Sequence, residues 1–363
     1  MNHHRSNPTQ ITAIVMQAIL GKASGGQDLS QDEMSEAVDS IMRGQCSAAE
    51  IALLLTALHH KGETVAEIAG AAAALRRHMT PIRTSRVGVI DTCGTGGDGS
   101  GTFNISTAAA LVIAAAGVPV AKHGNRRITS RSGSADVLAR LGVNIEADVS
   151  RVEACLEELG ICFCFAPLLH AAMKSVAEVR RQLPFPTIFN VLGPLTNPAG
   201  APFQLLGVGR PALRPLLAEA LARLGTQRAV VVCGEDGLDE VTISGTTFVS
   251  ETSVGTVREF RWSPADFDIP RASLAPLAAA GPEESAAHIR KVLAGHPGPS
   301  RDIVVLNAAA ALWTAGKAAT PVACARLAAE AIDQGAARDL LARLVELSNR
   351  VGATGSASAP PSL

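Results

Sequence analysis

Residues 87–124 read VGVIDTCGTGGDGSGTFNISTAAALVIAAAGVPVAKHG, and they carry the clearest structural signal in the chain. The apolar run 87–91 predicts a short strand, and the glycine-rich segment after it predicts a loop. Residues 106–117 read as a helix capped by Ser106 or Thr107, and residues 118–124 read as a second strand. Because a helical crossover joins the two strands, they should be parallel. The stretch predicts an α/β domain with a mainly parallel central sheet.

The rest of the chain extends this unit in both directions. Towards the amino end, residues 12–79 have apolar side chains at helical spacing, with breaks at 29–30, 45–47 and 61–63. Towards the carboxyl end, helices are expected near 135–141, 151–159, 211–224 and throughout 282–349. Strands are expected at 161–166, 229–233, 241–244, 247–251 and 258–262. Residues 170–196 are punctuated by prolines and read as helices that leave the sheet.

We therefore expect a small all-helical domain beside a large α/β domain. The helical domain covers 11–80, with a contribution from 170–200, and the α/β domain covers 81–169 and 201–350. Residues 1–10 are expected to be flexible. The low-complexity tail 351–363, rich in Ala, Ser and Pro, is expected to be disordered.

Composition limits the kind of protein. Of 363 residues, 47% are hydrophobic but only 3% are aromatic, which suits a core of aliphatic helices and parallel strands. A formal charge of -1 offers no net basic field for nucleic acid. The polar start lacks the apolar segment of a signal peptide, and the longest apolar stretch, 108–121, is too short for a bilayer. Seven scattered cysteines without C-x-x-C spacing indicate reduced thiols, so a cytoplasmic protein is expected.

The loop Gly94–Gly99 is the first candidate site. It follows the carboxyl end of a strand and precedes a helix, where open α/β sheets bind ligands. Its glycines allow backbone N–H groups to converge on phosphate oxygens, and the helix start adds a favourable dipole. The alternative interpretation, a tight turn before a capped helix, would account for only some of the glycines in this loop. A dinucleotide site would require an acidic residue after the second strand, where this chain has Lys122 and Arg126.

A second and a third segment complete the candidate site. Residues 122–136, KHGNRRITSRSGSAD, combine cationic side chains with hydroxyls and would bind a pyrophosphate or sugar phosphate, with His123 as a hydrogen-bonding scaffold. The acidic turn 234–240, GEDGLDE, follows another apolar strand and could hold Mg²⁺ together with substrate phosphates. The alternative interpretation of residues 234–240 is an acidic turn on the protein surface that binds no metal. Arg180 could bind a carboxylate, although the residues alone favour a surface arginine.

Taken together, several long motifs resemble those of anthranilate phosphoribosyltransferases. The motifs are 91–107, 122–138, 179–200 (VRRQLPFPTIFNVLGPLTNPAG) and 234–242, flanked by KGETVAEIAGAA at 61–72 and LNAAAALWTAGKA at 306–318. The resemblance covers roughly Leu20 to Asn349. It implies transfer of the phosphoribosyl group from phosphoribosyl pyrophosphate to the amine of anthranilate, in tryptophan biosynthesis. It also implies a cleft between the two domains, Mg²⁺ as cofactor and a homodimer formed through the helical domain.

The same resemblance implies a set of site residues. Anthranilate would contact Gly94, Asn125 and Arg180, with Arg180 on its carboxylate, and Mg²⁺ would be held by Ser106, Asp239 and Glu240. Phosphoribosyl pyrophosphate would contact Gly94, Gly97, Asp98, Thr102, Asn104, Ile105, Ser106, Thr107, Lys122, His123, Gly124, Asn125, Arg126, Ser130 and Ser134. No residue is expected to act as acid or base, because the amine is already neutral and nucleophilic.

Few positions depart from the family pattern. Ala171 stands where Pro is frequent, Arg127 and Thr129 where small residues and Ser are commoner, and Pro184 and Pro186 where Gly and Arg are usual. These positions bear on amine specificity more than on phosphate binding. Two alternatives are a pyrimidine nucleoside phosphorylase, which would require a different phosphate-loop signature, and a non-catalytic nucleic-acid-binding relative, which would lack the phosphate motif and have a basic groove.

Overall fold

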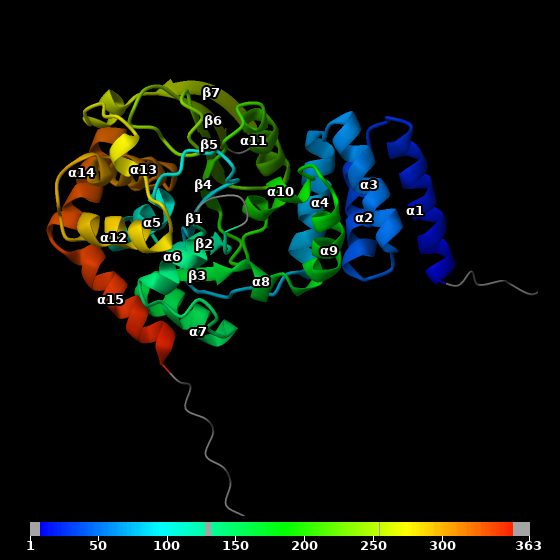
Figure 1. The fold of residues 1–363 in the computed structure, drawn as a ribbon, viewed down its shortest axis with the longest axis horizontal. Coiled ribbons are helices and arrows are strands. Elements are labelled where there is room, and N and C mark those ends of the chain that lie inside the picture. Colours follow the sequence, from blue (N-terminus) through cyan, green and yellow to red (C-terminus); the bar gives the residue numbers. More distant parts are fainter. Residues whose placement is uncertain (1–7, 128–131, 254, 351–363) are drawn as a thin grey trace, which may run out of the picture.

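A helical bundle and a larger α/β body lie side by side in the computed structural model (Figure 1). The structure describes residues 8–127, 132–253 and 255–350, with the backbone only for 8–13. This arrangement confirms the predicted fold class. Within the described ranges, no helix is both long and apolar enough to cross a bilayer. The expectations for Thr129, Ser130 and the tail 351–363 concern residues outside these ranges.

The bundle consists of four amino-terminal helices and one helix from the later excursion. These are α1 (Pro8–Ser24), α2 (Gln31–Met42), α3 (Ala48–Lys61), α4 (Val65–His78) and α9 (Lys174–Gln182). Helices α2, α3 and α4 each begin with a capping box, in which Ser30, Ser47 or Thr64 accepts from a backbone N–H three residues ahead. The predicted helix breaks are therefore confirmed. Helices α2 and α4 pack so closely that a Cβ at Gly70 would lie 2.2 Å from the Gln31 carbonyl oxygen.

The α/β body is organised around a seven-stranded sheet with the order β3-β2-β1-β4-β5-β6-β7. Strands β1 to β5 pair in parallel, and β6 and β7 extend the sheet in antiparallel fashion. The strands are β1 (Ile90–Gly94), β2 (Val120–Gly124), β3 (Ile161–Phe165), β4 (Phe203–Gly207), β5 (Arg228–Gly234), β6 (Thr247–Ser253) and β7 (Thr256–Trp262).

Neighbouring strands β1 and β2 separate towards their carboxyl ends. They share one registered pair, Ile90 with Val120, whereas β1 pairs with β4, and β2 with β3, over five positions each. Side chains bridge the gap: the Asp91 carboxylate accepts from the His123 N–H at 3.1 Å, and Lys122 Nζ donates to the Thr92 carbonyl at 2.6 Å. The separation leaves room for a cleft above the strand ends.

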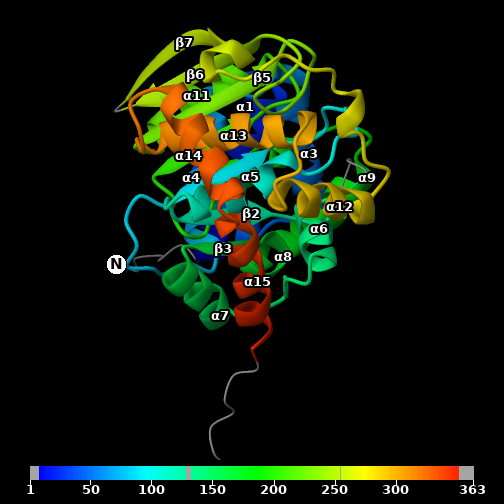
Figure 2. The same cartoon turned by 90° about the vertical axis from the view of Figure 1, so that its left-hand side faces the viewer.

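Helices cover both faces of the sheet (Figures 1 and 2). One face packs on α5 (Ile105–Ala115) and the carboxyl-terminal helices α12 (Pro282–Leu293), α13 (Pro299–Thr314), α14 (Pro321–Asp333) and α15 (Ala336–Asn349). The other face packs on α11 (Leu213–Arg223), which also contacts α4 of the bundle. Short helices complete the body: α6 (Ser134–Arg140), α7 (Val149–Ala154), continued by a π-helical turn at Cys155–Leu159, α8 (Ala166–Leu169) and α10 (Phe189–Leu192).

Three local predictions were wrong. Residues 241–244 are not a strand, because side chains take the place of a neighbouring strand: the Val241 N–H donates to Asn307 and the Thr242 hydroxyl donates to Asp236. Strand β4 was missed, because it has only five residues, follows a proline-rich segment and ends on Gly207. Helix α5 begins at Ile105 with Asn104 as N-cap, so Ser106 and Thr107 lie inside its first turn. The seven cysteines are free thiols, as predicted.

Candidate active site

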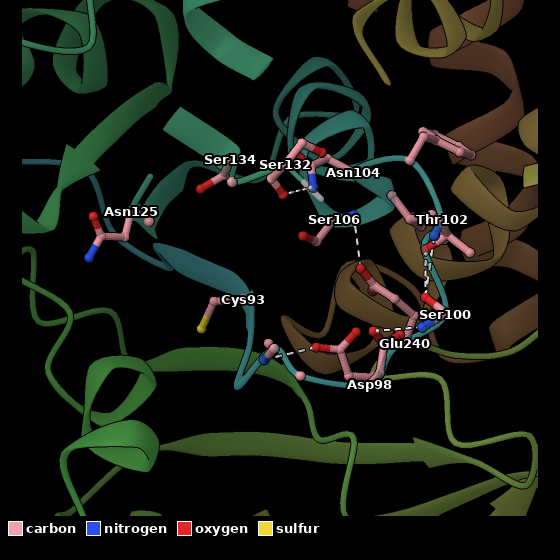
Figure 3. Close-up of a pocket in the computed structure, with 18 of the residues that line it drawn as sticks. Cys93, Asp98, Ser100, Thr102, Asn104, Ser106, Asn125, Ser132, Ser134 and Glu240 are labelled. Carbon is pink, nitrogen blue, oxygen red and sulfur yellow. Dashed lines mark hydrogen bonds between the residues drawn. The ribbon is translucent and has the colours of Figure 1, made fainter. Parts of the chain in front are cut away.

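A cleft of about 360 Å³ opens above the carboxyl ends of β1 and β2 (Figure 3). Three segments line it: the loop after β1 with the start of α5, the end of β2 with the segment before α6, and the turn after β5. Its walls are Cys93, Gly94, Gly96–Asn104, Ile105, Ser106, Lys122–Asn125, Ser132–Ser134, Asp239 and Glu240. The three segments predicted from the sequence therefore meet in one place.

The glycine loop has a backbone that other residues rarely adopt. Gly96, Gly97, Gly99 and Gly101 have φ between +67° and +80°. In this left-handed region a side chain would introduce strain, and glycine carries no such cost. Gly94 is required for a different reason, since a Cβ there would lie 2.5 Å from Asp239 Oδ2. The loop thus directs backbone groups into the cleft and allows the acidic turn to approach closely.

The acidic turn separates its carboxylates into two groups. Asp236 serves the turn itself, because its carboxylate accepts from the hydroxyls of Thr242 and Ser244, each at 2.5 Å. Asp239 and Glu240 face the cleft instead. Asp239 Oδ2 accepts from the Gly96 N–H and Glu240 Oε1 from the Ser106 N–H, both at 3.0 Å.

These two carboxylates are destabilised in their charged form. Burial, followed by the negative charge of Asp98, raises the pKa of Asp239 to about 7. Burial, followed by the charge of Asp239, raises the pKa of Glu240 to about 8. A cation between the carboxylates would relieve this repulsion. Among the described residues no group of three or more His, Cys, Asp and Glu side chains forms a complete metal site. Mg²⁺ often takes only one or two carboxylates with substrate phosphates, so this donor set fits it.

Lys122 supplies the positive charge at the base of the cleft. Its side chain is buried, and Nζ donates to the Thr92 carbonyl at 2.6 Å and to Ser106 Oγ at 3.1 Å. Burial lowers the pKa of Lys122, and the nearby Asp91 carboxylate opposes that shift. The ammonium group therefore lies close to the first turn of α5, beside the two cleft carboxylates.

Polar groups of the second segment form the opposite wall. Asn104 donates through Nδ2 to the Ser132 carbonyl at 3.3 Å, while its buried Oδ1 has no hydrogen-bond partner in the described structure. Since a buried polar atom normally finds a partner, this oxygen points to a missing ligand or water. Gly124 has no room for a Cβ, which would lie 2.2 Å from Ser134 Oγ. Ser134 and Asn125 thereby reach the cleft edge (Figure 3).

His123 is built into the scaffold. Its Nδ1 is 3.0 Å from the Gly193 carbonyl oxygen, which can only accept, so Nδ1 carries the proton. The Nε2 atom of neutral His123 then accepts from Nε2 of His170, 3.2 Å away. Burial, with the adjacent His170 as a smaller cause, lowers the pKa of His123 to about 3, and burial lowers that of His170 to about 4. Both rings are therefore neutral near pH 7.

Among the described residues, three predicted site residues do not line this cleft. Thr107 is buried, with an Oγ1 that has no partner among the described groups. Arg126 pairs with Glu146 at 2.8 Å outside the cleft. Arg180 lies on α9, where it donates to Asn190 Oδ1 at 3.1 Å. Ser130 falls outside the described residues.

Sequence reasoning also missed several lining residues. These are Cys93, Ser100, Gly101 and Phe103. All four lie within the motif 91–107, next to predicted residues. Gly96 and Gly99 were predicted as part of the glycine loop, and Ser132 and Gly133 as part of the segment 122–136. For Cys93, the position at the end of a predicted strand was the available signal.

Comparison with known proteins identifies the family. Residues 86–338 match the model described as "Glycosyl transferase family, a/b domain", and residues 17–79 match "Glycosyl transferase family, helical bundle domain". An anthranilate phosphoribosyltransferase from Moorella thermoacetica is 50% identical over 331 residues, which are 91% of this chain and 98% of the relative. The chain belongs to the anthranilate phosphoribosyltransferase family.

Solved structures agree with this family. The anthranilate phosphoribosyltransferase from Thermus thermophilus has a TM-score of 0.87 and 45% identity, covering 92% of this chain and 99% of that one. The enzyme from Saccharomyces cerevisiae, solved in complex with phosphoribosyl pyrophosphate and Mg, has a TM-score of 0.84 and 29% identity, covering 95% and 99%. A further structure of the yeast enzyme contains 4-fluoroanthranilate.

Proposed function

We propose that the cleft above β1 and β2 is where this chain performs the reaction of its family. The reaction transfers the phosphoribosyl group from phosphoribosyl pyrophosphate to the amine of anthranilate and releases pyrophosphate, a step of tryptophan biosynthesis. The enzyme uses Mg²⁺. One observation supports the location above all others: a glycine loop, a buried lysine and two destabilised carboxylates converge on a single cleft.

Different residues around the cleft bind different parts of the sugar donor. Backbone N–H groups of the glycine loop, the first turn of α5 and the Lys122 ammonium bind pyrophosphate oxygens. Asn104, Asn125 and Ser134 bind the donor from the other wall. Asp239, Glu240 and Ser106 hold Mg²⁺, which neutralises charge on the leaving pyrophosphate when bound. The remaining binding groups are those that the family resemblance implies, including Gly97, Asp98, Thr102 and Gly124.

Anthranilate binds on the side that faces the helical bundle. Gly94 and Asn125 line the cleft, and Arg180 belongs to α9 of the bundle. Arg180 is held by Asn190 and lies 5.8 Å from the Phe189 ring centre, which orients its guanidinium group. Because the Arg180 side chain lies outside the cleft in the described state, a change in side-chain position or domain spacing accompanies binding. The amine attacks as a neutral nucleophile, so the protein mainly positions it.

The proposal also covers the domain bounds, the oligomeric state and the cellular location. The chain comprises a helical domain at 11–80 with 170–200, and an α/β domain at 81–169 and 201–350. It forms a homodimer through the helical domain and works in the cytoplasm. Exposed apolar side chains on the bundle support the dimer, namely Ile14 on α1 and Leu53 on α3.

The direct test follows the fluorescence of anthranilate in the presence of enzyme, phosphoribosyl pyrophosphate and Mg²⁺. We expect a decay that requires all three components. Arg180→Ala should raise the KM for anthranilate about tenfold or more, and spare that for the sugar donor, because it removes one charged contact. Arg181→Ala is the matched control, since Arg181 is exposed and pairs with Glu178 on the same helix. A decay without Mg²⁺, or equal effects of both variants on anthranilate, would contradict the proposal.

A further inference from the structure

Asn307 lies outside the cleft but contacts the loop that carries the two cleft carboxylates. It belongs to α13, within the motif 306–318, and its side chain is fully buried. Its Oδ1 accepts from the Val241 N–H at 2.8 Å, and its Nδ2 donates to the Val241 carbonyl at 3.0 Å and to the Ile303 carbonyl at 2.9 Å. One amide side chain thus satisfies both backbone polar groups of the residue after Glu240.

This double contact imitates a strand pairing where no neighbouring strand is present. Residues 241–244 are not in a strand, so the polar groups of Val241 would otherwise be buried without partners. On the other side of the acids, the turn is held by Asp236, whose Oδ1 accepts from the Leu238 N–H at 3.1 Å. Asp239 and Glu240 therefore lie between two anchors, one inside the turn and one on a distant helix.

The positions of the Asp239 and Glu240 carboxylates are sensitive to small shifts of the turn backbone. A Cβ at Gly207 would lie 1.6 Å from the Asp239 carbonyl oxygen, so the backbone of the turn packs directly on β4. The Asp239 and Glu240 carboxylates reach Gly96 and Ser106 at 3.0 Å. A shift of the turn by a fraction of an ångström would change both contacts. Val241 is the residue through which α13 contacts this turn.

We propose that Asn307 is a positioning residue that sets the Asp239–Glu240 pair for Mg²⁺ and pyrophosphate binding. The inference rests on the proposed function of that pair. It assigns a role to α13, which contributes no side chain to the cleft lining. Because outer contacts of metal-binding groups commonly change metal affinity, a loss at Asn307 should appear first in Mg²⁺ binding.

The test compares Asn307→Leu with Thr314→Val. The leucine variant keeps the side-chain size but removes all three hydrogen bonds. Thr314 is a suitable control, because it is also fully buried on α13 and its Oγ1 bonds only to the Ala310 carbonyl of its own helix, at 2.7 Å. Mg²⁺ affinity is measured by calorimetry with phosphoribosyl pyrophosphate present. Hydrogen exchange of residues 236–244 is measured in the metal-free protein.

For Asn307→Leu we expect Mg²⁺ affinity to fall about 10- to 100-fold. Exchange in 236–244 should become about tenfold faster, while the KM for anthranilate changes little. Thr314→Val should bind Mg²⁺ as the wild type does. If Asn307→Leu does not fold, Asn307→Ser replaces it, since a single hydroxyl can make only part of the double contact. Wild-type Mg²⁺ affinity in the folded variant would overturn the inference. Absence of Mg²⁺ binding by the wild-type enzyme would instead overturn the proposed function.

Discussion

At the scale of single residues, the Asp239 and Glu240 carboxylates accept hydrogen bonds from N–H groups that a bound anion could also use. Asp239 and Glu240 accept from backbone N–H groups of the glycine loop and of the first turn of α5. Such N–H groups commonly bind phosphate. Burial, together with the negative charge of Asp98 on Asp239 and of Asp239 on Glu240, raises the pKa of both carboxyls and disfavours their charged forms. Residues that lower stability in this way are frequent at functional sites.

Replacing both acids by neutral isosteres should separate activity from stability. For Asp239→Asn combined with Glu240→Gln, we expect Mg²⁺-dependent turnover to fall about 100-fold. The melting temperature at pH 8.5 should stay equal or rise, because above pH 8 both carboxylates are charged in the folded state, where burial and neighbouring negative charge disfavour the charged form. Glu235→Gln, an exposed acid of the same turn, is the control. A large loss of stability with full turnover would show that the pair is structural.

At the scale of elements, tight helix contacts and a pair formed by buried His123 and half-buried His170 hold the site in place. Helices α2 and α4 approach closely at Gly70, and the end of β2 is tied to α8 by His123 and His170. The first contact stabilises the bundle, which includes the helix that carries Arg180. The second joins the α/β body to the segment that enters the bundle.

Adding a methyl group at Gly70 should weaken the bundle. A Cβ there would lie 2.2 Å from the Gln31 carbonyl, so Gly70→Ala should lower the free energy of unfolding by about 1–3 kcal/mol. Gly21→Ala in α1 is the control, because nothing lies within 4 Å of the added Cβ; it should be neutral or slightly stabilising. Urea unfolding measures both. Equal effects would refute the packing argument.

The histidine pair should make stability depend on pH. In the unfolded chain both rings have a pKa near 6.5, whereas folding lowers the values to about 3 and about 4. The unfolded state therefore binds more protons below pH 6.5, and stability present above this pH is lost as pH falls towards 4. Between pH 6.5 and 5.0 we expect a loss of about 2 kcal/mol per histidine.

Urea titrations at pH 7.5 and 5.0 check this dependence. His170→Gln should lose clearly less stability between these pH values than the wild type. His296→Gln, at an exposed histidine, should behave as the wild type. If all three proteins lose the same stability, the histidine pair does not control the acid response.

At the scale of the whole molecule, the bundle and the α/β body share an apolar core. The cluster that contains Leu54 and Ile68 of the bundle continues through Leu217 of α11 to Val231 of β5. Alternate residues of the strands divide between two cores, with Val230 and Val232 on the opposite face from Val231. The proposed domains are therefore packed together, and any closing motion must preserve this contact.

The proposed dimer can be tested on the bundle surface. Leu53 on α3 is 48% exposed, so Leu53→Glu should disrupt a dimer formed there and lower the mass measured by light scattering to that of a monomer. Leu168→Glu is the control, since Leu168 is 47% exposed but lies on α8. An unchanged mass for Leu53→Glu, or a monomeric wild type, would exclude a dimer through this face.

Local chemistry made much of this protein predictable from its sequence. Hydroxyl caps at Ser30, Ser47 and Thr64 act on backbone groups three residues away, so helix starts can be inferred without knowing the fold. The glycine loop can also be inferred without knowing the fold, because its positive φ values depend on glycine at each of these positions. Alternating apolar strands and helices then indicate parallel pairing and bring three motifs to one sheet edge.

Contacts between distant segments could not be inferred in this way. Whether an acid faces the cleft or its own turn depends on neighbours, so the spacing of the acids did not distinguish Asp236 from Asp239, and only the family resemblance implied Asp239. Residues 241–244 have strand character, yet the side chain of Asn307 replaces the expected strand partner. Arg180 lies where α9 packs against the bundle. These features depend on three-dimensional neighbours, because burial and hydrogen-bond partners arise from packing rather than from spacing along the chain.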